Sequence, residues 1–225
     1  MKISQVKFEN FFEQVQPAIT TVVLAGGLGT RIGGSKGLQQ LYGRPLIEWV
    51  LDSVSRQSEE ILINVNGVHD DYLCFGYPVI ADQIPNWVGP LAGLQSALRL
   101  ARHDWVASVP CDTPFLPVNL IARLFTAVNT INTAEASVAV VAGKRQPTIA
   151  LYHKSVLPKL DVYLNSGGRK VNNWLETLHL SEAVLDDAIA FTNINTLDDL
   201  TYANQIAVNV YAQDATETSI IKKNN

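Results

Sequence analysis

A glycine-rich stretch near the start of the chain constrains its fold more than any other feature. Residues 21–38 have the sequence TVVLAGGLGTRIGGSKGL, in which an apolar run from Val22 to Ala25 ends in Gly26-Gly27. The apolar run is typical of a buried parallel strand. Glycines directly after a strand let the backbone turn and approach a ligand closely, and the backbone N–H groups of such a turn form a concave anion site. The stretch therefore predicts a strand followed by an anion-binding turn.

Two basic side chains, Arg31 and Lys36, lie in the same loop and add positive charge beside the predicted turn. The loop differs from the two common phosphate-binding fingerprints. It has no Gly-Lys-Ser/Thr, as a P-loop would, and it matches G-x-G-x-x-G only loosely. We therefore expect a loop that binds phosphates in another way.

Helical and strand-like segments alternate after this loop. The apolar spacing predicts helices over 45–54, 90–101 and 116–128, and strands over 61–65, 78–81 and 105–109. Alternation of this kind is typical of an α/β fold, in which a mostly parallel central sheet carries helices on both faces.

The pattern is looser in the second half of the chain. We expect strands over 136–142, 148–152 and 190–192, helices over 155–165 and 170–178, and a last helix that starts near Leu197 and is capped by Thr196. The predicted domain organisation is an N-terminal extension over 1–17, a single domain over 18–210 and a polar tail over 211–225.

Composition excludes several classes of protein. With 225 residues, 47% of them hydrophobic, the chain is long enough for one sizeable core. Its net charge of −4 and its pI of about 5.5 do not suggest a nucleic-acid partner. The two cysteines form no disulfide framework, which suits a reducing compartment. The sequence has no apolar run near the ~20 residues of a membrane span and no clean signal-peptide core, so we expect a cytoplasmic protein.

Polar residues follow the predicted strands at the points where they end. Asn64, Asp82 and Asp112 all occupy such positions, and ligands of parallel sheets bind at the carboxyl ends of the strands. An anion-binding loop that faces an acidic group is the arrangement of a Mg²⁺–polyphosphate site. We expect Asp112 to be the metal ligand. Cys111 beside it has no evident partner base in the sequence and is expected to be a buried residue rather than a nucleophile.

Eight motifs in a fixed order resemble the molybdenum cofactor guanylyltransferase family: LAGGLGTRIGG, SKGL, GRPLIEWV, DQIPNWVGPLAGL, PCDTPFLP, QPTIAL, GGRKV and NINTLDDL. The first motif is shared with many nucleotidyltransferases, whereas GPLAG followed by PCDTPFLP is more specific. The resemblance covers residues 20–200. It implies a three-layer, Rossmann-like nucleotidyltransferase fold, with a nucleotide-binding half over about 18–116 and a pterin-binding half over about 117–210. It also implies Mg²⁺-dependent transfer of GMP from GTP to the terminal phosphate of molybdopterin.

The resemblance also implies roles for single residues. In the first half, Leu24, Ala25 and Gly26 would hold the guanine nucleotide by backbone contacts, Lys36 and Arg31 would neutralise its phosphates, Asn64 and Asp82 would contact the nucleoside, and Asp112 would bind Mg²⁺. In the second half, the polar candidates for the pterin are Arg145, Arg169, Lys170, Asn193 and Asn195. Transient contacts with other proteins of cofactor synthesis or with acceptor proteins are also implied.

The sequence departs from the family pattern before Lys36. The family has a variable residue, Asp and Lys after the double glycine, whereas here Gly33-Gly34 is followed directly by Ser35-Lys36. This departure favours one of the two alternatives to guanylyl transfer that stay open, the non-catalytic module. One is a related nucleotidyltransferase, such as a cytidylyltransferase for the same pterin or a sugar-phosphate nucleotidyltransferase. The other is a nucleotide-binding module without catalytic activity.

Overall fold

The computed structural model describes residues 17–27, 35–67, 70–84, 89–131 and 133–208. Most of the expected N-terminal extension, the middle of the glycine-rich loop with Arg31, and the expected polar tail lie outside the described residues. No helix of the described part of the chain is long and apolar enough to cross a membrane.

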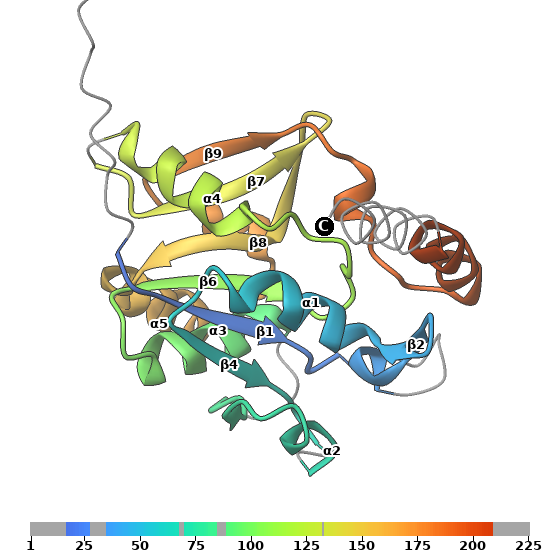
Figure 1. Cartoon of the computed structure of the whole chain (residues 1–225). Coiled ribbons are helices and arrows are strands. Elements are labelled where there is room, and N and C mark those ends of the chain that lie inside the picture. Colours follow the sequence, from blue (N-terminus) through green and yellow to red (C-terminus); the bar gives the residue numbers. More distant parts are fainter. Residues whose placement is uncertain (1–16, 28–34, 68–69, 85–88, 132, 209–225) are drawn as a thin grey trace, which may run out of the picture.

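One seven-stranded sheet organises the molecule, in the order β5-β4-β1-β6-β8-β7-β9 (Figure 1). Its strands are β1 (Ile19–Leu24), β4 (Glu60–Asn64), β5 (Val79–Ile80), β6 (Trp105–Pro110), β7 (Ala136–Val141), β8 (Lys144–His153) and β9 (Leu180–Leu185). Neighbouring strands are parallel, except that β8 runs antiparallel to both β6 and β7. The prediction of a mostly parallel central sheet is confirmed.

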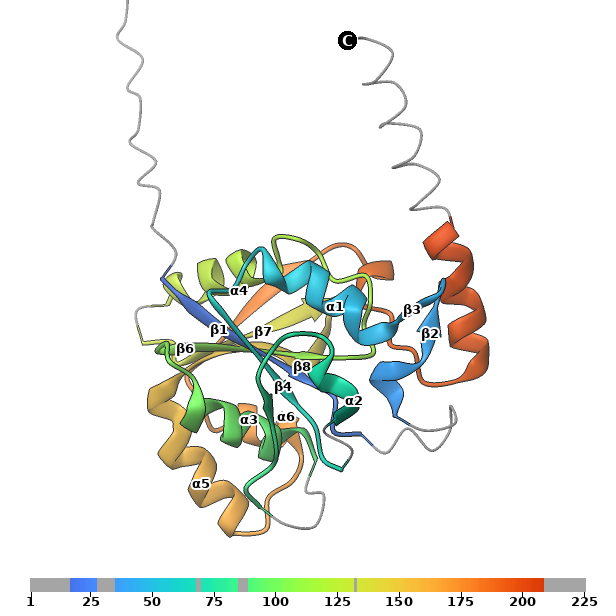
Figure 2. The same ribbon diagram turned by 60° about the horizontal axis from the view of Figure 1, so that its bottom comes forward.

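Helices cover both faces of this sheet, as Figure 2 shows from the side. On one face lie α1 (Leu46–Ser55) and α4 (Leu120–Asn129); on the other lie α3 (Pro90–Leu100), α5 (Leu157–Asn165) and α6 (Val171–Leu175). Each face has its own apolar core, because a twisted sheet buried on both sides separates two sets of side chains. Shorter helical turns are η1 (Lys36–Leu38), α2 (Asp70–Leu73), η2 (Lys154–Val156) and η3 (Ile189–Phe191). The three-layer arrangement predicted from the alternation is confirmed.

The second half differs from the prediction at two places. The expected strand over 190–192 is wrong: Ile189–Phe191 forms a 3-10 turn, because Asp187 Oδ1 accepts the N–H groups of Ile189 at 3.0 Å and Ala190 at 3.1 Å. Strand β9 was not predicted. It alternates buried and exposed residues, but its buried positions carry small side chains such as Ser181 and Ala183, which give a weak hydrophobic signal.

A third, smaller core joins residues 41–49 to residues 194–207. A helix over 197–208 packs beside α1 and a two-stranded hairpin, β2 (Gln40–Leu41) with β3 (Arg44–Pro45), which the sequence analysis did not predict. The buried residues of this core are Leu41, Leu46, Trp49, Ile194, Ala203 and Ala207. The contact holds the segment before the helix, residues 192–195, against the carboxyl end of β6, where Ile194 N–H donates to Asp112 O at 2.9 Å.

Thr196 caps this last helix, as predicted. Its Oγ1 accepts the N–H of Asp199 at 3.1 Å, while Asp199 Oδ2 accepts the N–H groups of Asn195 and Thr196, each at 2.9 Å. These hydrogen bonds lower the pKa of the Asp199 carboxyl, because they favour its charged form. The reciprocal pair satisfies backbone donors that the helix start leaves without intrahelical partners.

The contribution of the Thr196 cap to helix stability can be tested by substitution. We expect Thr196→Ala to destabilise the helix over 197–208 by about 1 kcal/mol, the usual cost of losing an N-cap side chain. Amide hydrogen exchange over 200–208 should then become about fivefold faster. The matched control is Thr201→Ala in the exposed middle of the same helix, where alanine is the better helix former. Equal exchange in the two variants would contradict the cap's contribution.

Candidate functional site

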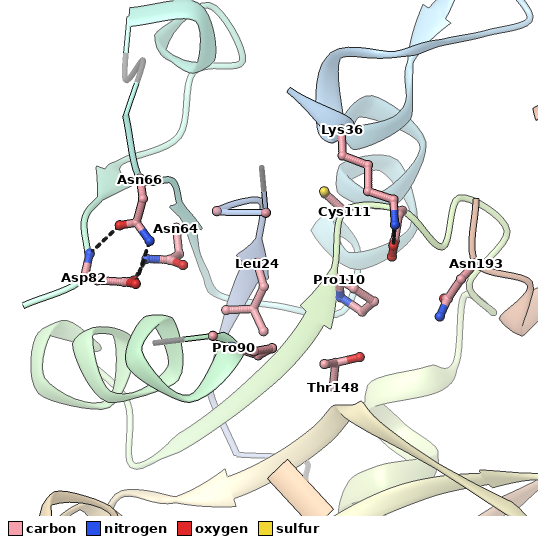
Figure 3. A pocket seen from close by; sticks show the side chains of 14 residues that line it. Leu24, Lys36, Asn64, Asn66, Asp82, Pro90, Pro110, Cys111, Thr148 and Asn193 are labelled. Carbon is pink, nitrogen blue, oxygen red and sulfur yellow. Dashed lines mark hydrogen bonds and ion pairs between the residues drawn. The ribbon is translucent and has the colours of Figure 1, made fainter. Parts of the chain in front are cut away.

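The candidate site lies where the carboxyl ends of three parallel strands meet. In the sheet register Leu24, near the end of β1, pairs with Asn64 of β4 on one side and with Pro110 of β6 on the other. A cavity of about 400 Å³ opens at this edge (Figure 3). It is lined by Leu24, Gly26, Gly27, Lys36, Asn64, Asn66, Asp82, Gly89, Pro90, Pro110, Cys111, Asp112, Thr148 and Asn193. The cavity occupies the place where open α/β sheets bind their ligands.

The predicted glycine turn forms the centre of this edge. Ala25 N–H donates to Asn64 O at 2.8 Å, and Cys111 N–H donates to Leu24 O at 3.1 Å, so the turn is tied to both neighbouring strands. Gly26 and Gly27 line the cavity directly after it. Arg31, which we expected in the same loop, lies outside the described residues.

Lys36 and Asp112 form an ion pair inside the cavity (Figure 3). Both side chains are mostly buried, with 16% and 13% of their surfaces exposed. The Lys36 ammonium also donates to Asn195 Oδ1 at 2.6 Å. The predicted phosphate-binding lysine, the predicted metal ligand and one predicted pterin residue therefore meet at one point, although they come from three distant parts of the chain.

A second polar cluster lies on the opposite side of β1. Asn64 Nδ2 donates to Asp82 Oδ1 at 2.9 Å, and Asn66 Nδ2 donates to Asp82 Oδ2 at 2.5 Å. The backbone N–H of Asp82 returns a bond to Asn66 Oδ1 at 3.0 Å. Asn64 and Asp82 were predicted from the sequence, whereas Asn66 was not. The feature that could have indicated Asn66 is its position two residues after Asn64, since alternate residues of an extended chain lie on the same side.

The remaining predicted residues divide into two groups. Asn193 lines the cavity, and its Oδ1 accepts a hydrogen bond from Thr113 Oγ1 at 2.5 Å. Arg145, Arg169 and Lys170 are not among the described residues that line it. Arg145 pairs with Glu182 at 2.7 Å, and Arg169 donates to the backbone carbonyls of Leu164, near the end of α5, and of Gly168. Thr148, which sequence analysis did not single out as a site residue, lines the cavity from β8.

The residues present fit a magnesium ion that is shared with a polyphosphate. Within the described part of the chain no three His, Cys, Asp or Glu side chains gather into a metal site, so no all-protein cage exists there. Mg²⁺ needs only one or two carboxylates when phosphates and water supply its other ligands. Asp112 can meet this need through Oδ1, which Thr113 Oγ1 approaches only to 3.5 Å, while its Oδ2 pairs with Lys36. Both oxygens of Asp82 already accept short bonds from asparagines.

A glycine turn, a lysine–aspartate pair and a second polar cluster at the carboxyl edge of a parallel sheet are typical of a nucleotide-binding α/β protein. Comparison with known families defines it further. The chain belongs to the family described as the MobA-like NTP transferase domain, whose model matches residues 21–183. It is thus a nucleotidyltransferase, and the resemblance seen in its motifs is confirmed.

Individual relatives agree with this assignment. A molybdenum cofactor guanylyltransferase of Cupriavidus metallidurans is 44% identical over 188 residues, covering 81% of this chain and 92% of that protein. One from Vibrio vulnificus is 40% identical over 195 residues, covering 85% and 98%. Among solved structures, molybdopterin-guanine dinucleotide biosynthesis protein A from Archaeoglobus fulgidus superposes with a TM-score of 0.67 at 25% identity, covering 84% of this chain and 99% of that one.

Cys111 lines the cavity, but its surroundings do not favour reaction of its thiol. Cys111 is 4% exposed, and its burial together with the charge of the neighbouring Asp112 raises the pKa of its thiol far above the usual range. The thiolate, which is the reactive form, is therefore scarce at neutral pH. Cys74, by contrast, is exposed.

This difference in exposure is testable with a thiol reagent of the disulfide-exchange type. We expect the native protein at pH 7.5 to react quickly with one equivalent, at Cys74, and with the second only after unfolding in guanidinium chloride. Cys74→Ser should remove the fast phase and leave the slow one. Two fast equivalents in the native protein would contradict the buried, protonated state of Cys111.

Proposed function

We propose that this protein transfers GMP from GTP to the terminal phosphate of molybdopterin, releasing pyrophosphate and forming molybdopterin guanine dinucleotide. The single observation that carries the proposal is the convergence of Lys36, Asp112 and Asn195 beside the glycine turn of β1. The names of the relatives support the guanine nucleotide and the pterin acceptor.

In this proposal the nucleoside lies on the Asp82 side of β1. The backbone of Leu24, Ala25 and Gly26 approaches it at the strand end. At its edge the Asn64 amide can donate or accept hydrogen bonds, whereas the Asp82 carboxylate accepts them. A carboxylate suits the N–H donors of guanine or the hydroxyls of the ribose. The turn at Gly26 and Gly27 leaves room for a ligand to lie against the main chain.

The phosphates lie toward Lys36. Its ammonium already lies in the site beside Asp112, and it would exchange this carboxylate for the phosphates when a triphosphate binds. Asp112 is the proposed ligand of Mg²⁺, which when bound would offset the negative charge of the triphosphate. Arg31 of the glycine-rich loop is proposed as a second cation for the same phosphates.

The acceptor binds on the side of the second half of the chain. Asn193 and Asn195, held next to Asp112 and Lys36, are proposed to orient it. Arg145, Arg169 and Lys170 remain proposed contacts for the more distant parts of the pterin. A phosphate monoester is already anionic at neutral pH, so its oxygen can attack the α-phosphorus of GTP without a strong general base. Catalysis then depends on positioning the two phosphates and neutralising their charge.

Nucleotide preference is the first test. We expect calorimetry with Mg²⁺ to give clearly tighter binding of GTP than of CTP, ATP or UTP, and we expect pyrophosphate release only when molybdopterin is added. Preference for CTP would point instead to a cytidylyltransferase. Tight GTP binding without pyrophosphate release would identify a non-catalytic binding module.

A substitution of the proposed metal ligand tests the chemistry directly. We expect Asp112→Ala to abolish turnover, with a loss of at least about 10²-fold, because it removes the carboxylate that holds the charge-neutralising ion. The exposed Asp186 provides a matched control, and Asp186→Ala should keep the wild-type rate. The far-UV spectra of both variants should match that of the wild type. Turnover near the wild-type rate in Asp112→Ala would contradict the assigned role.

A further inference from the structure

Asn66 forms a closed pair of hydrogen bonds with one residue, Asp82. The asparagine amide donates to the carboxylate at 2.5 Å, and its carbonyl accepts the backbone N–H of the same aspartate at 3.0 Å. One asparagine thus fixes both the side chain and the main chain of Asp82. Asn66 itself is half-buried and lines the cavity.

The geometry leaves Asp82 fixed yet still able to accept further hydrogen bonds. Asn64 Nδ2 holds its other oxygen at 2.9 Å, so the carboxylate cannot rotate without breaking one of the two amide contacts. A carboxylate has about four lone-pair directions, and each of its oxygens here uses one of them for an asparagine. The remaining directions are available to a ligand in the cavity.

The cluster is packed tightly by elements on either side. A Cβ atom at Gly26 would lie 3.1 Å from Asn66 Nδ2, and a Cβ atom at Gly93 of α3 would lie 2.1 Å from Asn64 Oδ1. The residue after Asp82 is also held, because Gln83 N–H donates to Ser96 Oγ of α3 at 3.1 Å. The glycine turn and α3 therefore hold both asparagines against the aspartate, and the orientation of Asp82 is set before a ligand binds.

We propose that Asn66 is a positioning residue that determines nucleoside specificity, by orienting the Asp82 carboxylate toward N–H or O–H donors of the bound nucleoside. The inference rests on the proposed function, since it assumes that the nucleoside lies on the Asp82 side of β1. It assigns to Asn66 no contact with the reacting phosphates, which lie beside Lys36 and Asp112.

Two variants of Asn66 test the proposal. Asn66→Ala removes both hydrogen bonds, and Asn66→Asp keeps the size of the side chain but sets a second carboxylate beside Asp82. Binding of GTP, CTP and 2′-deoxyGTP is measured by calorimetry, and KM and kcat are measured with GTP and molybdopterin. Asn173→Ala, an exposed asparagine of α6, is the matched control. Thermal unfolding identifies any variant that does not fold.

We expect Asn66→Ala to weaken GTP binding about tenfold, the scale of losing hydrogen bonds to a charged group. KM should rise by a similar factor while kcat changes less than about threefold, because the phosphate side is intact. If Asp82 contacts the base, the ratio of GTP affinity to CTP affinity should fall about tenfold. If Asp82 contacts the ribose, the ratio of GTP affinity to 2′-deoxyGTP affinity should fall by that factor instead. Asn66→Asp should bind GTP more weakly still, because its new carboxylate and that of Asp82 repel each other.

Unchanged affinity and preference in both folded variants would overturn the proposal. An equal loss for all three nucleotides would also overturn it, since that result indicates support of the fold rather than of specificity. Failure of the proposed function has a different signature: the wild-type protein itself would not prefer GTP.

Discussion

The register of β1 between its two parallel neighbours is the constraint on which the rest of the site depends. Because Leu24 pairs with Asn64 on one side and Pro110 on the other, three strand ends stop at one edge of the sheet. The segments that follow them must all turn there. A shift of one residue in either ladder would move the side chains of a strand from one buried face to the other and separate the two polar clusters.

The two clusters have different electrostatic characters. On one side of β1 a lysine ammonium neutralises Asp112, so this region can take up phosphate charge when Lys36 and Asp112 exchange partners. On the other side, the side-chain contacts of Asp82 within the described residues come from neutral amides, and a carboxylate suits the N–H and O–H donors of a nucleoside. In the proposed function, these opposed preferences would give a nucleotide one direction in which to bind.

Much of the fold could be predicted from local patterns because each element buries one clear face. Helices α1, α3 and α4 and the central strands carry regular apolar spacing, and their positions matched the prediction within a few residues. The failures share a cause. Strand β9 packs small side chains, η3 is held by the side chain of Asp187, and the β2–β3 hairpin is covered by a helix about 160 residues later. In each of these places a specific contact, rather than the spacing of apolar residues, determined the structure.

The sequence by itself determined the glycine turn, the residues at the strand ends and, through its ordered motifs, the family. It placed Asn64, Asp82 and Asp112 at the candidate site because a strand end is a local property, and Lys36 because it belongs to the glycine-rich loop. Only the tertiary structure decided which of them touch. Lys36 and Asp112 are 76 residues apart, and Asn66 bonds with Asp82 only because β5 pairs with β4. Such pairings depend on strand order and helix packing, which are set by burial across the whole sheet rather than by any one segment.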